Sequence, residues 1–294
     1  MTVWLIIVIL AHLFYALIFI IDKYIISRPL PHPVVYTFYV SVLSIFIWVL
    51  IPFGFSFPST HYVIWSILAG IFQVIGCIYF YKALNLGEVS RIIPFVGSFV
   101  AIFILILSSL LIKEHLSGEQ ILAFILLVLG SLIISFKKKD VFQKPFILAL
   151  FSALLFAVFW VITKYIFLGT SFISGLVWIR TGVVIIALFL LLPRKNRQLI
   201  FRETGELKPR TIKFFSGGRI LTIAAGFFMY LAVFLGSVTL ANSLQGLQYA
   251  FVLILALLFF RKIPSLREEF SKEIIVQKII AIILISIGLF ILII

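Results

Sequence analysis

The chain has 294 residues, of which 64% are hydrophobic and 12% are charged, and its mean hydropathy is +1.29. Soluble domains carry about a quarter charged residues, so this composition excludes an ordinary soluble protein. The net charge of +14 is compatible with nucleic-acid binding. However, the basic runs 137–139 and 194–197 directly follow apolar runs, which is typical of topology signals and of contact with anionic lipid head groups. We therefore expect membrane lipids as partners and no nucleic acid.

The apolar residues fall in runs long enough to cross about 30 Å of hydrocarbon. They predict an all-α polytopic membrane protein with ten transmembrane helices. The longest connection, from Pro193 to Arg219, is polar and basic. The predicted spans are residues 3–21, 34–51, 62–81, 92–112, 121–136, 146–167, 172–192, 220–240, 244–260 and 274–294.

Weak internal similarities recur in the same order along the chain. Asp22-Lys23-Tyr24-Ile25 ends the first span, and Thr163-Lys164-Tyr165-Ile166 ends the sixth, about 141 residues later. Two further pairs follow: the acidic turns 114–119 and 268–273, and Gly130 with Gly288. These pairs predict two five-helix repeats, residues 1–140 and 141–294. Since five is odd, the second repeat enters the membrane from the opposite side, which makes the repeats inverted, as in many secondary transporters.

The basic residues predict the orientation. Of the 24 Lys and Arg residues, 21 fall in or beside the connections after spans one, three, five, seven and nine. Basic loops stay in the cytoplasm, so we expect a multi-pass protein of the cell membrane with both termini outside. A miscounted span is the alternative, because it would move whole loops across the membrane.

The stretch from Tyr81 to Ser135 resembles the fourth and fifth helices of the EamA-type family in the drug/metabolite transporter superfamily. The matching residues are Tyr81, Ala83, Leu84, Pro94, Glu114 and Gly130. Lys113 stands where the family usually has Gly. The resemblance implies export or uptake of a metabolite, an amino acid or a drug. It also implies cytoplasmic termini, from which the charge pattern departs.

Two ionisable residues within predicted spans are the first site candidates, because charges at membrane depth are costly. His12 lies in the middle of the first span. It either hydrogen-bonds between helices or couples proton movement to transport. Arg180 lies in the seventh span. It either meets an anionic group of a substrate, or binds backbone carbonyls and snorkels to an interface. No predicted span carries Asp or Glu at its middle, which argues against carboxylate-based exchange of protons for lipophilic cations.

Neutral polar and aromatic residues complete the predicted substrate site. Gln245, Gln248 and Tyr249 share one helix face by their spacing, and such groups either hold helices together or line a cavity. The family resemblance implies that the starts of helices four and nine approach a central cavity. The remaining candidates are Gln73 in the third span, Arg91 and Phe95 at the start of the fourth, and Trp160 as an aromatic wall.

Together these features predict a secondary transporter that moves a small organic solute by alternating access, with proton coupling as an option. The alternative is a channel or a membrane scaffold without transport. The sequence has no phosphate-binding loop, no Ser-His-Asp set and no metal-ligand spacing, so we expect no enzyme, no cofactor and no metal. We expect a monomer or a homodimer. The combination of His12, Arg180 and no buried carboxylate favours zwitterionic or anionic solutes.

Overall fold

The computed structural model describes residues 3–25, 32–87, 89–135, 144–205, 209–259 and 272–294. These residues are almost entirely helical and contain no strand. Residues 268–271 of the predicted acidic turn 268–273, and the predicted repeat boundary at 137–143, lie outside the described residues.

The first half forms helices that follow the predicted spans closely. Pro33 occupies the first turn of its helix, where its missing N–H costs nothing, and His32 Nδ1 accepts a hydrogen bond from Val34 N. That helix continues as a 3₁₀ segment up to Gly54, which has the left-handed φ of 109°. The elements are α1 (Val3–Ile25), α2 (Pro33–Val42), η1 (Leu43–Phe53), α3 (Thr60–Leu86), α4 (Val89–Leu111) and α5 (Gly118–Ser135).

The second half departs from the predicted spans in two places. The connection after α7 contains a helix, α8, and α9 then begins eleven residues before the predicted start of the eighth span. That span also ends early, because the chain turns at Gly236 and the Ser237 hydroxyl caps a new helix by accepting from Leu240 N at 2.9 Å. The elements are α6 (Lys144–Leu168), α7 (Phe172–Phe189), α8 (Arg194–Gly205), α9 (Pro209–Leu235), α10 (Val238–Ser243), α11 (Gln245–Phe259) and α12 (Lys272–Ile293).

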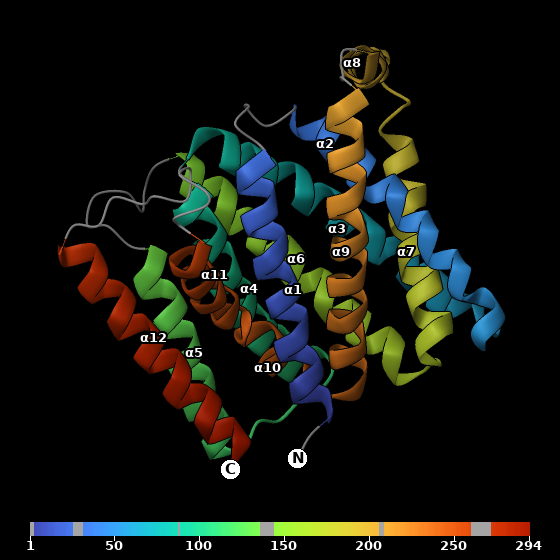
Figure 1. The fold of residues 1–294 in the computed structure, drawn as a ribbon. Helices are drawn as coiled ribbons and strands as arrows, with labels where there is room; N and C mark the ends of the chain where they lie inside the picture. The colour runs from blue at the N-terminus through green and yellow to red at the C-terminus, as the bar shows by residue number, and fades with distance from the viewer. Residues whose placement is uncertain (1–2, 26–31, 88, 136–143, 206–208, 260–271) are drawn as a thin grey trace.

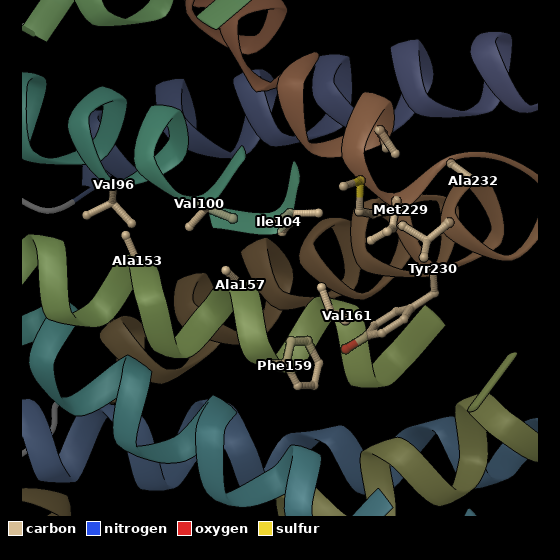
Figure 2. Close-up of a cluster of buried hydrophobic side chains, with 14 of the residues drawn as sticks. Val96, Val100, Ile104, Ala153, Ala157, Phe159, Val161, Met229, Tyr230 and Ala232 are labelled. Atoms are coloured by element: carbon tan, nitrogen blue, oxygen red, sulfur yellow. The ribbon is translucent and has the colours of Figure 1, made fainter. Parts of the chain in front are cut away.

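Small residues allow the central helices to approach closely. Ala153 and Ala157 of α6 face Val96, Val100 and Ile104 of α4 in the buried core (Figure 2). An added Cβ at Gly70 of α3 would clash with the backbone carbonyl group of Gly182 in α7. Close packing of this kind, rather than burial from water, holds helices together in lipid.

The periphery is apolar. Large hydrophobic side chains remain exposed along several helices, and within the described residues five helices are long and apolar enough to span a bilayer. Shorter apolar segments lie within α1, α5, α9 and α12. The beginning of α1 and the end of α12 lie at one end of the bundle, and α8 lies at the other (Figure 1). The chain is a multi-pass membrane protein.

Candidate functional site

Arg180 is the centre of the site. It lies halfway along α7 and is only partly buried. One guanidinium nitrogen donates to the Tyr230 hydroxyl of α9 at 3.1 Å, and the other donates to the Ser44 hydroxyl of η1. Among the described residues, no carboxylate lies within ion-pair distance of it. A cation at membrane depth is thus held by neutral oxygens from two other helices.

Aromatic rings from α6 and α9 gather at Tyr230, the partner of the guanidinium. Its carbon lies 5.7 Å from the centre of the Tyr230 ring, which is within cation–π range. Trp160 of α6 packs against the same ring at 5.2 Å, and Phe167 lies at 6.4 Å. Tyr230 extends from α9 beside Phe159 (Figure 2). Trp160 therefore packs on the ring that contacts Arg180, and its predicted role as an aromatic wall stays a prediction.

Gln73 lies on α3, which packs against both α6 and α7. It donates a weak hydrogen bond to the sulfur of Cys77, one turn further along α3, at 3.8 Å. The predicted residues Gln73, Trp160 and Arg180 thus belong to one group of helices, α3, α6 and α7.

His12 is a buried polar residue on α1. Its side chain is 3% exposed, and Nε2 lies 3.4 Å from the carbonyl oxygen of Ala241 in α10. A carbonyl oxygen only accepts, so Nε2 carries the proton and Nδ1 is an acceptor. Nδ1 is buried and has no partner among the described side chains and backbone groups. This bond matches the helix-to-helix alternative, and Nδ1 keeps an unused acceptor position.

Gln245 and Tyr249 lie together on α11, as their spacing predicts. Gln245 Nε2 donates to the Tyr249 hydroxyl at 3.3 Å. The Gln245 amide fits against Gly97 of α4, where an added Cβ would approach its carbon to 2.5 Å. Gln248, on the same helix, is partly exposed.

Arg91 and Phe95 form a third group at the start of α4. Phe95 is 2% exposed and packs against Phe99 at 4.5 Å and Phe146 at 5.1 Å. The Arg91 guanidinium lies 5.5 Å from the centre of the Phe146 ring. This group is tightly packed between α4 and α6, and its predicted contact with solute stays a prediction.

Several participating residues were not predicted from the sequence. Ser44 and Tyr230 complete the Arg180 site, yet a single Ser or Tyr in an apolar run is common. Lys164 of α6 donates to the carbonyl oxygens of Val233 at 2.9 Å and Gly236 at 2.6 Å. These carbonyls end α9 and have no partner within the helix. Lys164 could have been found from the sequence, because it is a cation near the end of the sixth predicted span, but its place in the sequence repeat gave no reason to expect a bond to α9.

The glutamate of the family-like turn links the two halves. Glu114 Oε2 accepts a hydrogen bond of 2.6 Å from the Thr239 hydroxyl of α10, and Thr239 also lies 2.9 Å from the Ser108 hydroxyl. Lys113 has a φ of 54°, the left-handed conformation that favours glycine. This explains why a glycine is usual at its position in the family. Among the described residues, no group of three His, Cys, Asp or Glu side chains is gathered.

The described residues thus form a bundle of apolar helices that holds a cation against an aromatic ring. Residues 2–136 match the model of the EamA-like transporter family, part of the drug/metabolite transporter superfamily. The matched residues make up just under half of the chain, and the match confirms the predicted resemblance. It implies a membrane transporter of the drug/metabolite type.

A crystal structure titled only as that of a protein shares the fold, with a TM-score of 0.65. The match covers 98% of this chain and 95% of the other, with 15% sequence identity. No curated protein matches the sequence. At this identity the solved structure supports the fold alone.

Proposed function

We propose that this protein is a secondary transporter that carries a small anionic or zwitterionic organic solute by alternating access, with Arg180 as the anion-binding group. The observation that carries the proposal is the way Arg180 is held. An arginine at the centre of a membrane helix costs at least about 2.5 kcal/mol. Its described partners, Ser44 and Tyr230, are neutral hydroxyls, so the positive charge stays uncompensated until an anion binds.

The aromatic rings suit an organic solute. The Tyr230 ring lies beside the guanidinium and Trp160 packs against that ring, and ligand sites typically combine such aromatic walls with a few polar groups. A carboxylate on Arg180 would gain a charge-assisted and bidentate hydrogen bond. A lipophilic cation would instead be repelled.

Alternating access requires two halves that move against each other, and paired contacts support an inverted repeat. An added Cβ at Gly130 in α5 would meet Ala281 O and Ile285 of α12. One at Gly288 in α12 would meet Ala123 O and Leu127 of α5. The residues in these two sets of contacts are equivalent and lie 158 positions apart along the chain: Gly130 and Gly288, Ala123 and Ala281, and Leu127 and Ile285.

The ends of α3 and α9 form a second pair of equivalent contacts. Gly87 ends α3 by donating its N–H to Ala83 O at 2.9 Å, and Gly236 ends α9 by donating to Ala232 O at 2.9 Å. Both glycines and both alanines are separated by 149 residues, and a new helix starts two residues after each glycine. We infer two halves of common descent, residues 1–140 and 141–294, with opposite orientations in the membrane.

The repeat is tested by symmetric substitution. Gly130→Ala and Gly288→Ala place a methyl group in equivalent contacts, so we expect similar losses of stability, each about 1–3 kcal/mol. Gly118→Ala is the control, since nothing lies within 4 Å of an added Cβ there. Thermal unfolding in detergent provides the readout, and strongly unequal losses at the two sites would count against the repeat.

The orientation is tested by labelling. The charge pattern places both termini outside and the basic loops, including α8, in the cytoplasm. Single cysteines at Thr2 and Gln198 in a Cys77→Ala background, treated with an impermeant maleimide on intact cells, should label only at position 2. Labelling at position 198 alone would show that the protein has the opposite orientation, with both termini in the cytoplasm.

The transport function is tested in proteoliposomes. A thermal-shift screen of organic acids, amino acids and organic cations selects solutes, and counterflow of a labelled solute then measures exchange. We expect anionic or zwitterionic solutes to show saturable counterflow. A linear flux without counterflow would indicate a channel, no flux would indicate a scaffold, and selective transport of lipophilic cations would refute the charge argument.

A further inference from the structure

Helix α8 is the feature that solute transport leaves unexplained. It begins at Arg194, only five residues after α7 ends at Phe189. It lies at the end of the bundle, with its axis across the direction of the long helices (Figure 1). Because α7 is an apolar helix of span length, this position sets α8 near the level of the lipid head groups.

One face of α8 attaches to the protein. Ile200 is fully buried, and Leu199 and Asn196 are partly buried. The helix packs on α2. These residues lie within about 100° on a helix with 3.6 residues per turn, so the opposite side is turned away from the bundle.

The opposite face is basic and carries one large aromatic ring. Arg194, Lys195 and Arg197 are exposed, and Phe201 is 63% exposed. Arg194, Arg197 and Phe201 have the spacing i, i+3, i+7 and share one stripe. From Arg194 to Arg202 the helix contains no acidic residue. An exposed phenylalanine among cations is unfavourable in water but typical of helices that lie in a membrane interface.

We propose that α8 is an interfacial helix that binds anionic phospholipids. Arg194, Lys195 and Arg197 would pair with the head-group phosphates, while Phe201 enters the boundary with the acyl chains. The neighbouring Leu192 is 71% exposed and continues the apolar contact towards α7. Charge complementarity favours anionic over zwitterionic phospholipids, since zwitterionic lipids offer no net negative charge to the three cations.

The test places a spin label on the outer face of α8. Phe201→Cys in a Cys77→Ala background is labelled and reconstituted into vesicles of phosphatidylglycerol with phosphatidylcholine, or of phosphatidylcholine alone. Power saturation with oxygen and with a water-soluble nickel complex reports the depth of the label. We expect a membrane-buried label in the anionic vesicles and a more water-exposed label in the neutral vesicles.

A charge variant and a matched control assign the effect to α8. Arg194→Gln with Lys195→Gln and Arg197→Gln should weaken the anionic-lipid dependence of insertion on the order of 100-fold in partition constant. Lys82→Gln with Lys113→Gln and Lys144→Gln removes the same charge elsewhere and should leave the label at position 201 buried. Native mass spectrometry should show fewer retained phosphatidylglycerol molecules on the α8 variant only.

Two outcomes would overturn the proposal. A label at position 201 that is fully accessible to the nickel complex in both kinds of vesicle would show that α8 does not enter the interface. If the label stays water-exposed on anionic vesicles but becomes shielded by added polyglutamate, the basic face serves an acidic protein segment instead.

Discussion

Arg180 and Lys164 are both cations within apolar helices, but the protein holds them in different ways. Lys164 Nζ donates to backbone carbonyls at the end of α9, including Val233 and Gly236. Those carbonyls need donors, and a cation at a helix C-terminus is also favoured by the helix dipole. Arg180 has only the hydroxyls of Ser44 and Tyr230 among the described residues. The comparison separates a cation that completes the fold from one whose charge is kept for a ligand.

The largest effect is expected at Arg180. Arg180→Gln removes the anion-binding charge but keeps a polar side chain, so solute counterflow should fall by at least about 100-fold, equivalent to the loss of a charged hydrogen-bond pair. Arg180→Lys should recover only part of it, because an ammonium lacks the planar fork. Melting temperatures near that of the wild type would confirm that the fold is intact. Unchanged counterflow in Arg180→Gln would contradict the proposal.

Lys164 should respond in the opposite manner. Lys164→Met leaves the carbonyls at the end of α9 without donors, so we expect a loss of about 2–3 kcal/mol in unfolding free energy. The folded fraction should still bind solute. Denaturation in mixed micelles measures the loss, and Lys164→Arg should restore part of the stability. If Lys164→Met abolished solute binding and left stability unchanged, Lys164 would be a solute-binding residue and not a structural one.

Smaller effects are expected at the residues that orient the guanidinium. Tyr230→Phe removes the hydroxyl and retains the ring, and Ser44→Ala removes the second partner. Each should weaken solute affinity about 10-fold, as for one hydrogen bond to a charged group. The double variant should differ from the sum of the two, since both act on one side chain. Isothermal titration measures the affinities, and Thr181→Val, one residue from Arg180, is the control.

The smallest effect concerns a cation with neither role. Lys113 is exposed and adopts a φ of 54°, which costs a side-chain-bearing residue roughly 1 kcal/mol. Lys113→Gly should therefore leave transport unchanged and stabilise the protein by up to about 1 kcal/mol. A thermal melt compares it with Lys113→Ala, which should gain nothing. A clear loss of stability in the glycine variant would show that the lysine side chain contributes to the fold.

The sequence predicted the long helices well, because their apolar runs match the thickness of a bilayer. It missed α8 and the early start of α9, since a polar and basic segment such as residues 194–219 lacks the apolar periodicity that reveals a buried helix. It also placed the end of the eighth span too late. The apolar run continues through Gly236 and Ser237, and only the capping bond from Leu240 N to Ser237 shows the break.

The site was only partly predictable. Arg180 and Trp160 were identifiable because an arginine or a tryptophan in an apolar run is unusual. Their partners were not, because Ser44 and Tyr230 lie 136 and 50 residues away from Arg180 along the chain. Such contacts depend on how η1, α7 and α9 pack, which no local pattern encodes. The same holds for Lys164, whose role depends on the end of a helix about 70 residues further on.

The most direct test of the central claim compares the charge of the solute with the charge of the protein. Binding of an organic acid found in the screen and of its uncharged methyl ester would be measured by isothermal titration on the wild type and on Arg180→Gln. We expect the wild type to prefer the acid strongly and Arg180→Gln to bind the acid and the ester equally weakly. Equal preference for the acid in both proteins would contradict it, because the anion would then be recognised elsewhere.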